Sequence, residues 1–588
     1  MKIIKPTRLI NSPIFAFLLF IILIIFKVLI IEFNTGPTLF YDELLFLEHS
    51  RNLLNNEPVT SSLYPPAYPI FLVPAIISNH NWYEYVILIN IVISSSIIFP
   101  VWLLGKKILT PILNLISTLL VFLNPYNIAY PGYILSENLY LPIFLFAVYL
   151  SISLYNKSKI KQLLFGVFLG FCLLTKYIFL PSALFFIALW GYQEFFLDSK
   201  KENALKRAKN TLHKITIVTS GFVIAVTPWI LYVYFVLKQP THNALGLGIS
   251  GIKALNSVSL SSIILWISSY ISFTFISIFF FISTLLLFSV LTIIKKIKLN
   301  RNERTMVFTV IFLTVGHVMV ATQHSWGASY NYPNPQYLIG RYLTPTIPLI
   351  VIISLFAYHK IYNLKKLNFF VLLFINIVSG LLIYFSYEIL YKGLWFSLPN
   401  YFARNIFNSP NSYQYSLLNP SILISIAIIP SIHLFLRRII KKELIFLPFI
   451  ILLLTQIFTI PKFIKLTNDF RSWGIHGRII TPIIKEVVAN RNTDINFSSD
   501  SYYFSKPNNF YHLFLVWGLT ASEIKKVHIF EFNKKYPTYY FSSENLPYKI
   551  IINYSNNNRN YNLYYIDNEV SQKVYNQTLE YPSKSVKK

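Results

Sequence analysis

Long apolar runs recur along most of this chain of 588 residues. Each run of about 18 or more residues is long enough to cross the hydrocarbon core of a bilayer as a helix. The mean hydropathy of +0.53 exceeds that of a soluble globular chain of similar length. The sequence therefore predicts an all-α polytopic membrane bundle.

About thirteen spans are expected. The first run, Pro13 to Ile31, is too long for the apolar region of a cleavable signal peptide, and no small-residue cleavage site follows it, so we expect a signal anchor. Lys27 lies near the outer end of this run and is interpreted as a snorkelling side chain. The predicted spans run near 13–33, 84–104, 108–124, 138–155, 163–176, 178–193, 213–237, 262–294, 306–322, 341–358, 368–391, 417–436 and 444–462.

The basic residues follow the order of the spans. The chain has 51 Lys and Arg against 23 Asp and Glu, which gives a net charge of +28. Every second connection is basic, and the remaining connections are rich in Pro, Asn and Tyr. By the positive-inside rule, the N-terminus lies inside and the C-terminus outside. We find no RNA- or DNA-binding motif, so nucleic acid is not an expected partner. The basic connections are 105–107, 156–162, 198–214, 295–304, 359–366 and 437–443.

The apolar runs stop near Lys465, which divides the chain into two predicted domains. Residues 1–464 form the membrane domain, with a first outer loop at 34–83. Residues 465–588 combine a helical pattern with short β-like runs and are expected to form a small α/β domain outside the cytoplasm. The single Cys172 excludes intrachain disulfides and any zinc site with several cysteines.

An acidic pair, Asp42 and Glu43, directly follows the first predicted span. The stretch "YDELLFLEHSRNLL" is typical of an amphipathic helix in the outer membrane interface, with Asp42 at its start. Acidic residues also favour helix N-termini for structural reasons alone, because they interact with free N–H groups and with the helix dipole. On this segment alone the structural and the catalytic interpretations stand equal.

Further charged residues from distant segments are predicted at the same outer face. "YILSENLY" brings Glu137, and the short span ending in "FCLLTKY" brings Lys176. The connection before the tenth span contains His324 and ends in "YLIGRYLTPTIP", which places Arg341 and Tyr342 at the membrane edge. Lys176 and Arg341 each also have a simple interpretation as interfacial anchors, and His324 in a polar loop as a solvated side chain.

The order of these motifs resembles the GT-C glycosyltransferase superfamily, in the branch of protein O-mannosyltransferases and lipid A aminoarabinose transferases. The shared order is an Asp-acid pair in the first outer loop, a "PP" segment before the second span, a Ser-Glu, a Thr-Lys, and a late Arg-Tyr followed by prolines. The resemblance covers roughly residues 1–360. One feature departs from the aminoarabinose branch, which carries an acid-Lys pair before its "PP", where this chain has Leu63 and Tyr64.

The resemblance implies an inverting glycosyltransferase that moves a single sugar from a polyprenyl phosphate to an acceptor hydroxyl on the outer face of the membrane. Asp42 would be the catalytic base, and Glu43 or Glu137 would orient the acceptor or a metal. Lys176 and Arg341 would stabilise the phosphate leaving group. The remaining substrate-binding candidates are His324 and Tyr342. The implied partners are a lipid-linked sugar donor, a glycan, lipid or protein acceptor, and membrane lipids.

No metal site is fixed by the sequence. A divalent cation is an open option, and Glu48, His49 and His324 are available as ligands, but their spacing defines no metal site. Other functions also stay open: an oligosaccharyltransferase or O-antigen ligase, or a non-catalytic polysaccharide export protein or flippase. Transporters tend to carry ionisable residues at the membrane midplane, whereas here the ionisable residues gather at the outer edge.

Overall fold

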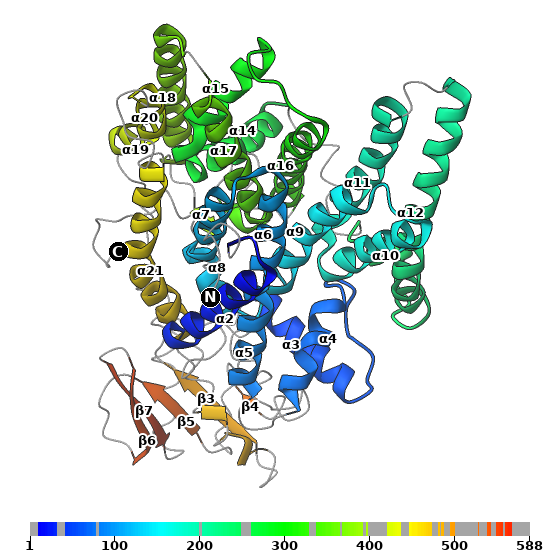
Figure 1. Ribbon diagram of the computed structural model, residues 1–588. Helices are drawn as coiled ribbons and strands as arrows, with labels where there is room; N and C mark the ends of the chain where they lie inside the picture. Colours follow the sequence, from blue (N-terminus) through cyan, green and yellow to red (C-terminus); the bar gives the residue numbers. More distant parts are fainter. Residues whose placement is uncertain are drawn as a thin grey trace, which may run out of the picture.

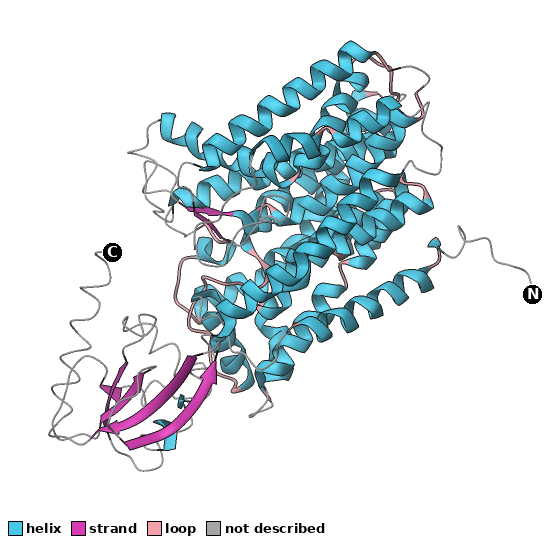
Figure 2. Ribbon diagram, turned by 90° about the vertical axis from the view of Figure 1, so that its left-hand side faces the viewer, coloured by secondary structure: helices cyan, strands magenta, loops and turns pink. Residues whose placement is uncertain are grey.

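The computed structural model describes most of the helical part of the chain and separate segments of the C-terminal part. The described residues are 10–31, 41–77, 82–198, 203–247, 260–327, 337–364, 367–391, 395–397, 420–436, 446–472, 480–481, 484–486, 488, 494–499, 527–528, 538–542, 549–556 and 559–566. The fold is a bundle of helices with a β-sheet at one end (Figures 1 and 2).

The first half of the bundle runs from α2 to α12 and includes the helix that carries the acidic pair. Helices α5 and α6 together make one candidate span, and α3 and α4 lie between α2 and this span in the sequence. The helices are α2 (Pro13–Ile30), α3 (Tyr41–Leu54), α4 (Ala67–Ile76), α5 (Trp82–Ser95), α6 (Ile98–Ile108), α7 (Pro111–Phe122), α8 (Pro125–Ala129), α9 (Glu137–Leu154), α10 (Lys159–Thr175), α11 (Leu180–Tyr192) and α12 (Ala204–Phe235).

The second half continues the bundle and supplies much of its apolar core. The helix α17 is almost wholly buried, because it is packed against α6, α7, α15 and α16. The helices are α14 (Leu260–Ser277), α15 (Phe279–Ile293), α16 (Arg301–Gly327), α17 (Ile347–Tyr362), α18 (Phe369–Tyr391), α19 (Pro420–Ala427), α20 (Ile429–Leu436) and α21 (Leu447–Ser472).

All of the predicted spans fall on helices, but not all of these helices are long. Among the described residues, 9 helical segments are long and apolar enough to cross a membrane. The other predicted spans coincide with the shorter helices α7 and α10, with the pair α19 and α20, and with the short apolar part of α21, Leu447–Pro461. The long run predicted at 262–294 is broken at Ile278, where the backbone leaves the helical conformation between α14 and α15. The chain is thus a multi-pass membrane protein, while its span count stays a prediction.

Lys27 does not snorkel, and that interpretation is wrong. Its side chain is fully buried, and its Nζ donates a hydrogen bond to Ser94 Oγ at 2.8 Å. The reason is that α2 packs against α5 and α6, which brings a hydroxyl partner within reach of the lysine inside the bundle.

Two close helix crossings depend on small residues. Gly166 and Gly170 lie four residues apart on α10 and face α12, where a Cβ on Gly166 would stand 2.0 Å from the Val218 carbonyl oxygen. Gly221 of α12 approaches α10 in the same way, because a Cβ there would stand 2.2 Å from the Leu163 carbonyl oxygen. Small residues at this spacing allow helix backbones to pack closely in a membrane.

The C-terminal part contains a mixed five-stranded sheet. The strands are β3 (Ile495–Ser499), β4 (Val527–His528), β5 (Thr538–Ser542), β6 (Lys549–Asn556) and β7 (Arg559–Ile566), in the order β4-β3-β5-β7-β6. Strand β3 pairs in parallel with β4 and β5, whereas β7 pairs antiparallel with β5 and β6. The β-like runs identified in the sequence carry β4, β6 and β7. A separate short pair joins β1 (Tyr337–Ile339) to β2 (Trp395–Ser397).

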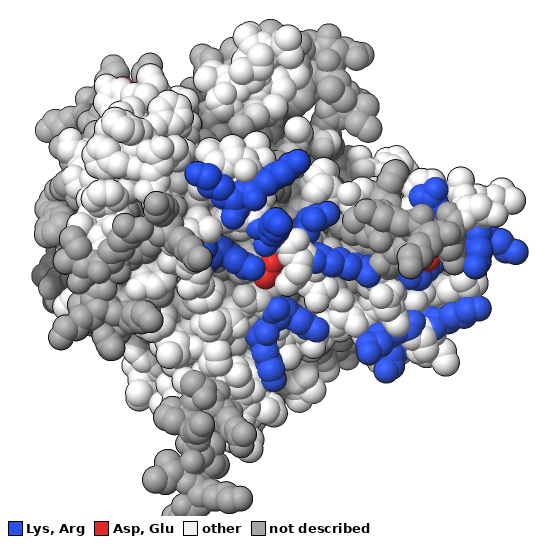
Figure 3. Space-filling model, turned by 45° about the horizontal axis from the view of Figure 1, so that its top comes forward, with Lys and Arg blue, Asp and Glu red and all other residues white. Residues whose placement is uncertain are grey.

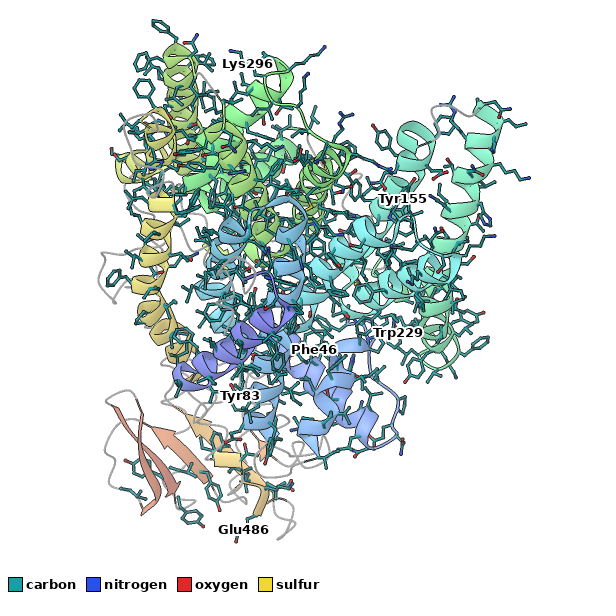
Figure 4. All side chains as sticks on the ribbon, viewed as in Figure 1. Phe46, Tyr83, Tyr155, Trp229, Lys296 and Glu486 are labelled. Carbon is teal, nitrogen blue, oxygen red and sulfur yellow. The ribbon has the colours of Figure 1, made fainter. Side chains whose placement is uncertain are left out.

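Basic side chains gather on one face of the bundle. Lys and Arg side chains gather on the face that comes forward when the top of Figure 1 is turned toward the viewer (Figure 3). Lys296 lies near this end, and Glu486 lies at the opposite end, beside the sheet (Figure 4). The predicted topology, and the side of the membrane on which each end lies, stay predictions.

Candidate functional site

Four charged side chains from four distant parts of the chain meet in one cluster, which we call the charge cluster. Arg341 donates to Asp42 Oδ2 at 2.5 Å, across 299 residues of sequence. Lys176 forms an ion pair with Glu137. The two pairs are joined because Arg341 Nε also lies 3.6 Å from Glu137 Oε1. Two carboxylates and two cations therefore balance one another within the charge cluster.

The members of the charge cluster are shielded from solvent to different degrees. The side chains of Asp42 and Arg341 keep 20% and 19% of their exposure, whereas Glu137 keeps 2%. The Asp42–Arg341 pair is thus the accessible side of the cluster, and Glu137 forms its base. An interaction between partly buried charges is screened less than one at an open surface.

Asp42 is held in its charged form. Burial raises the pKa of its carboxyl group, but the Arg341 guanidinium, the Tyr64 hydroxyl and the Lys176 ammonium outweigh that effect, so the pKa lies below its usual value. Tyr64 donates to Asp42 Oδ1 at 2.5 Å. Each carboxylate oxygen thus has one donor and retains a lone pair for another.

Local structure explains where each charged residue stands. Asp42 occupies the first turn of α3. Glu137 is the first residue of α9. Lys176 directly follows α10 in an extended conformation, and Arg341 lies in a 3₁₀ turn, Gly340–Tyr342, before α17. All four residues lie at or beside helix termini, where the chain leaves the helical ladder and side chains from different helices converge.

The segment before Glu137 is fixed by buried polar side chains. Asn138 Nδ2 donates to the carbonyl oxygens of Tyr130, Tyr133 and Leu135. Asn90 Nδ2 donates to the Tyr133 carbonyl oxygen at 3.1 Å. A buried backbone segment needs such partners because its polar groups have no water to bond, and the result is a rigid support for Glu137.

Aromatic rings surround the cations. Lys176 Nζ lies 5.4 Å from the ring centroid of Tyr342 and 5.9 Å from that of Tyr140. Arg341 also lies near the Tyr342 ring, at 5.8 Å. These distances suit cation–π attraction. Tyr342 thus lies beside both cations of the cluster, and its predicted role in substrate binding stays a prediction.

His324 is close to the charge cluster but is not in a loop. Helix α16 continues to Gly327, so His324 lies in its last turns, half-buried, with its ring edge-on to Tyr342 at a centroid distance of 4.9 Å. The prediction of a solvated side chain is therefore wrong, because the helix extends further than the apolar run.

Glu43 is bound by the backbone of another segment. Its side chain is fully buried, and Oε1 accepts a hydrogen bond from the Ile134 N–H at 2.9 Å. His49 is buried as well. The expected polar face of α3 is thus partly internal. Helix α3 packs against α4, and Ser50 of α3 donates to the carbonyl oxygen of Pro69 in α4. Through Glu43, α3 also contacts the backbone at Ile134.

Tyr64 and Tyr140 were missed from the sequence. Tyr64 stands directly before Pro65 and Pro66, where the aminoarabinose branch that the motif order resembles has a lysine, and that position was its only signal. Tyr140 follows Glu137 by one helical turn, which places it beside Lys176 once Glu137 and Lys176 pair. For the metal option, no group of three or more His, Cys, Asp or Glu is gathered within the described ranges.

The bundle and the charge cluster together define a class: integral membrane proteins with an aromatic-lined site of paired charges at one end. No family model matches the sequence, and no curated protein matches it either.

Solved structures show a distant likeness. ArnT from Cupriavidus metallidurans in the apo state is 10% identical over 94% of this chain and 97% of that chain, with a TM-score of 0.42. The same enzyme bound to undecaprenyl phosphate gives 9% identity, coverage of 94% and 98%, and a TM-score of 0.39. An oligosaccharyltransferase from Archaeoglobus fulgidus, tethered with an acceptor peptide, is 10% identical. The match covers 70% of this chain and 61% of that chain, with a TM-score of 0.36. Both proteins are GT-C membrane glycosyltransferases, the superfamily that the motif order resembles. At these values the likeness carries no argument about activity.

Proposed function

We propose that the chain is an inverting glycosyltransferase that moves one sugar from a polyprenyl-phosphate donor to an acceptor hydroxyl on the outer face of the membrane. The observation that carries this proposal is the charge cluster, in which an ionised, partly exposed Asp42 stands beside two fixed cations. A base for an incoming hydroxyl and positive charge for a departing phosphate are the two requirements of such a transfer.

In this reaction Asp42 acts as the general base. The acceptor hydroxyl gives its proton to the free lone pair of an Asp42 oxygen as the acceptor oxygen bonds to the anomeric carbon. The bond from that carbon to the phosphate oxygen breaks on the opposite face, and its electron pair leaves with the phosphate. A single displacement of this kind inverts the anomeric centre.

The cations of the charge cluster serve the leaving group. Negative charge on the phosphate grows as the glycosidic bond breaks, and Arg341 offers a planar set of donors that suits phosphate oxygens. Lys176 adds a second positive charge, held in place by Glu137. Both cations are already fixed by their carboxylate partners, so they need little reorganisation when the charge develops.

The location of the charge cluster suits a lipid-linked donor. Asp42 belongs to α3, which lies at the end of the bundle that carries the sheet (Figure 1), and the apolar outer surfaces of neighbouring helices provide contact for a polyprenyl chain. The proposed partners are therefore a lipid-linked sugar, a glycan, lipid or protein acceptor, and the surrounding lipids. We place the protein in the cell membrane with its C-terminal domain outside the cytoplasm.

Replacing Asp42 by Asn tests the proposal. The amide keeps the size of the side chain and one acceptor oxygen but carries no charge and cannot take the proton, so we expect transfer to fall by about a hundredfold or more. Purified protein is incubated with radiolabelled polyprenyl-phosphate sugars and a membrane extract, and label in new acceptors is counted.

Glu48→Gln is the matched control, because Glu48 lies on the same helix, outside the charge cluster. It should transfer as the parent does and keep the parent's melting temperature, whereas Asp42→Asn should stay folded with a lower melting temperature, because Arg341 loses its anionic partner. If a folded Asp42→Asn protein transferred sugar as fast as the parent, Asp42 would not be the catalytic base. Absence of transfer by the parent with every donor would favour a binding or export protein.

A further inference from the structure

The loop between α3 and α4, residues Glu57–Pro66, contacts the charge cluster through Tyr64, and we call it the strap. It begins after Asn56, whose φ of 57° reverses the chain at the end of α3, and it ends in Pro65 and Pro66. Prolines fix their own φ and bias the preceding residue toward an extended conformation. The backbone around Tyr64 is therefore restricted by sequence alone.

The strap is fastened to the end of α12 at two points. The Val59 N–H donates to the Tyr232 hydroxyl at 2.9 Å, and Ser62 bonds to Gln239 just beyond the helix. The Val59 side chain is 4% exposed and belongs to a small apolar cluster with Trp229 and Val233. Trp229 stacks on Tyr232 with ring centroids 5.5 Å apart, which holds that hydroxyl in place.

A third contact joins the strap to the segment that carries Lys176. Tyr177 directly follows this lysine, and its hydroxyl donates to the Ser62 carbonyl oxygen at 2.9 Å. Trp229 Nε1 in turn donates to the Tyr177 hydroxyl at 3.0 Å. Gly246 packs closely against the same tyrosine, since its φ is +71° and a Cβ there would stand 2.5 Å from the Tyr177 Cβ.

The strap thus contacts the charge cluster directly at Asp42 and also contacts Tyr177, the residue that follows Lys176. Through Tyr64 it donates to Asp42, the acidic group; through Ser62 it accepts from Tyr177, the neighbour of the basic group. Burial and the Asp42 charge both raise the pKa of Tyr64, so its hydroxyl stays a proton donor to the carboxylate. Only four residues of the strap lie between Val59, which contacts α12, and Tyr64, which contacts Asp42.

We propose that the strap is a positioning device for the transfer reaction, with Tyr64 as the residue that orients the Asp42 carboxylate and Tyr232 as the anchor that holds the strap. The role of Tyr64 in the reaction rests on the proposed function, whereas the docking of the strap does not. Tyr64 acts through Asp42, and Tyr232 acts through the strap backbone, so neither is itself a catalytic residue.

A buried reporter cysteine measures whether the strap is held by Tyr232. Val59→Cys places a thiol at a buried position of similar size, and the native Cys172 is itself fully buried, which keeps the background low. A water-soluble maleimide then labels position 59 only when the strap lifts. Adding Tyr232→Phe removes one hydroxyl and its hydrogen bond, and we expect labelling to become about three- to tenfold faster.

Tyr234→Phe is the matched control for labelling. Tyr234 lies on the same helix but is 54% exposed, so its hydroxyl has no part in the docking of the strap, and the labelling rate should equal that of the parent. Equal rates for Tyr232→Phe and Tyr234→Phe would overturn the docking of the strap through Tyr232. This result is independent of transfer, so it decides the anchor even if no sugar is moved.

The reaction gives the second arm of the test. Removing the Tyr64 hydroxyl by Tyr64→Phe withdraws a donor from the charged Asp42, so the pKa of Asp42 rises and the acid limb of the pH–rate profile moves to higher pH. Tyr232→Phe should lower kcat and leave that limb in place, because the donor is still present. An unmoved acid limb in an active Tyr64→Phe protein would refute the positioning role, since a purely structural tyrosine would lower activity equally at every pH.

Discussion

Asp42 and Glu43 are adjacent in the sequence and do different work in the structure. Successive residues on a helix point about 100° apart, so neighbours do not face the same partner. Asp42 turns to Arg341, and Glu43 accepts the Ile134 N–H inside the protein. The sequence marks both carboxylates as unusual at this place, but only packing separates the one at the charge cluster from the one that supports the fold.

Arg341 is expected to be poorly replaced by lysine. Arg341→Lys keeps the positive charge but loses the planar donors that reach Asp42 at 2.5 Å and Glu137 at 3.6 Å. We expect kcat for sugar transfer to fall about tenfold or more, with an unchanged melting temperature in detergent. Equal kcat for the two proteins would mean that charge alone is needed at this position.

His49 should make stability depend on pH. Burial lowers the pKa of His49 from 6.5 to about 4, so the unfolded chain binds this proton more tightly than the folded one. The stabilising effect of the neutral imidazole is fully present above pH 6.5 and is lost as the pH falls toward 4, at a cost on the order of 2 kcal/mol. Thermal unfolding at pH 7 and pH 5 measures it.

His49→Gln is the control for this dependence, because the amide does not titrate. The variant should lose less stability than the parent between the two pH values, whatever its absolute melting temperature. Parallel losses in both proteins would assign the effect to other groups.

Several of the site's charged residues could be predicted from the sequence, and its hydrogen-bond donors could not. Asp42, Glu137, Lys176 and Arg341 are visible because charges are scarce at span ends, where each carries a desolvation cost. Tyr64 belongs to a chain in which tyrosine is common, with 41 copies, so nothing in its own identity sets it apart before the strap is folded over Asp42.

At the scale of helices, hydropathy identifies apolar runs but not the places where helices break. The run at 262–294 and the helix pair α5 and α6 are each continuous in composition and interrupted in structure. Hydropathy reports transfer into lipid, which is indifferent to a local change of φ and ψ. Helix α16 shows the converse, since it extends beyond its apolar run and brings His324 to Tyr342.

The crossing of α10 and α12 offers a sharp test of packing. Gly166→Ala places a methyl group 2.0 Å from the Val218 carbonyl oxygen, so the helices must separate, and we expect a loss of about 1–3 kcal/mol in the free energy of unfolding. Because α10 leads into Lys176 and α12 holds the strap, transfer should fall as well.

Gly316→Ala on α16 is the matched control, since a Cβ there meets no atom within 4 Å. It should be neutral or slightly stabilising, because alanine favours the helix over glycine. Similar melting temperatures for the two variants would contradict the close crossing.

At the scale of the whole molecule, the alternation of basic connections predicts which ends of the helices lie together, and the structure groups Lys and Arg at one end (Figure 3). The sheet at the opposite end is harder to derive. Its β-like runs are visible in the sequence, but the strand order β4-β3-β5-β7-β6 differs from the chain order. Strand β3 pairs with β4 and with β5, and such non-local pairing leaves no periodic signal.

Single cysteines at the two ends test the orientation. Lys296 and Glu486 are exposed and lie at opposite ends of the molecule (Figure 4). In intact cells, a membrane-impermeant maleimide should label Glu486→Cys and not Lys296→Cys, and both should react after the membrane is permeabilised. Labelling in the reverse pattern would place the charge cluster on the cytoplasmic side and exclude the proposed topology.

The ion pair between Asp42 and Arg341 spans 299 residues, and this separation has a consequence for biosynthesis. The ribosome makes the carboxylate long before it makes the guanidinium, so every nascent chain passes through a stage in which α3 has formed and its later counter-ion does not yet exist. During that stage Asp42 must be solvated without Arg341. Completion of the cluster is therefore a late event of biosynthesis. A polypeptide released before Arg341 is made would keep Asp42 without its counter-ion.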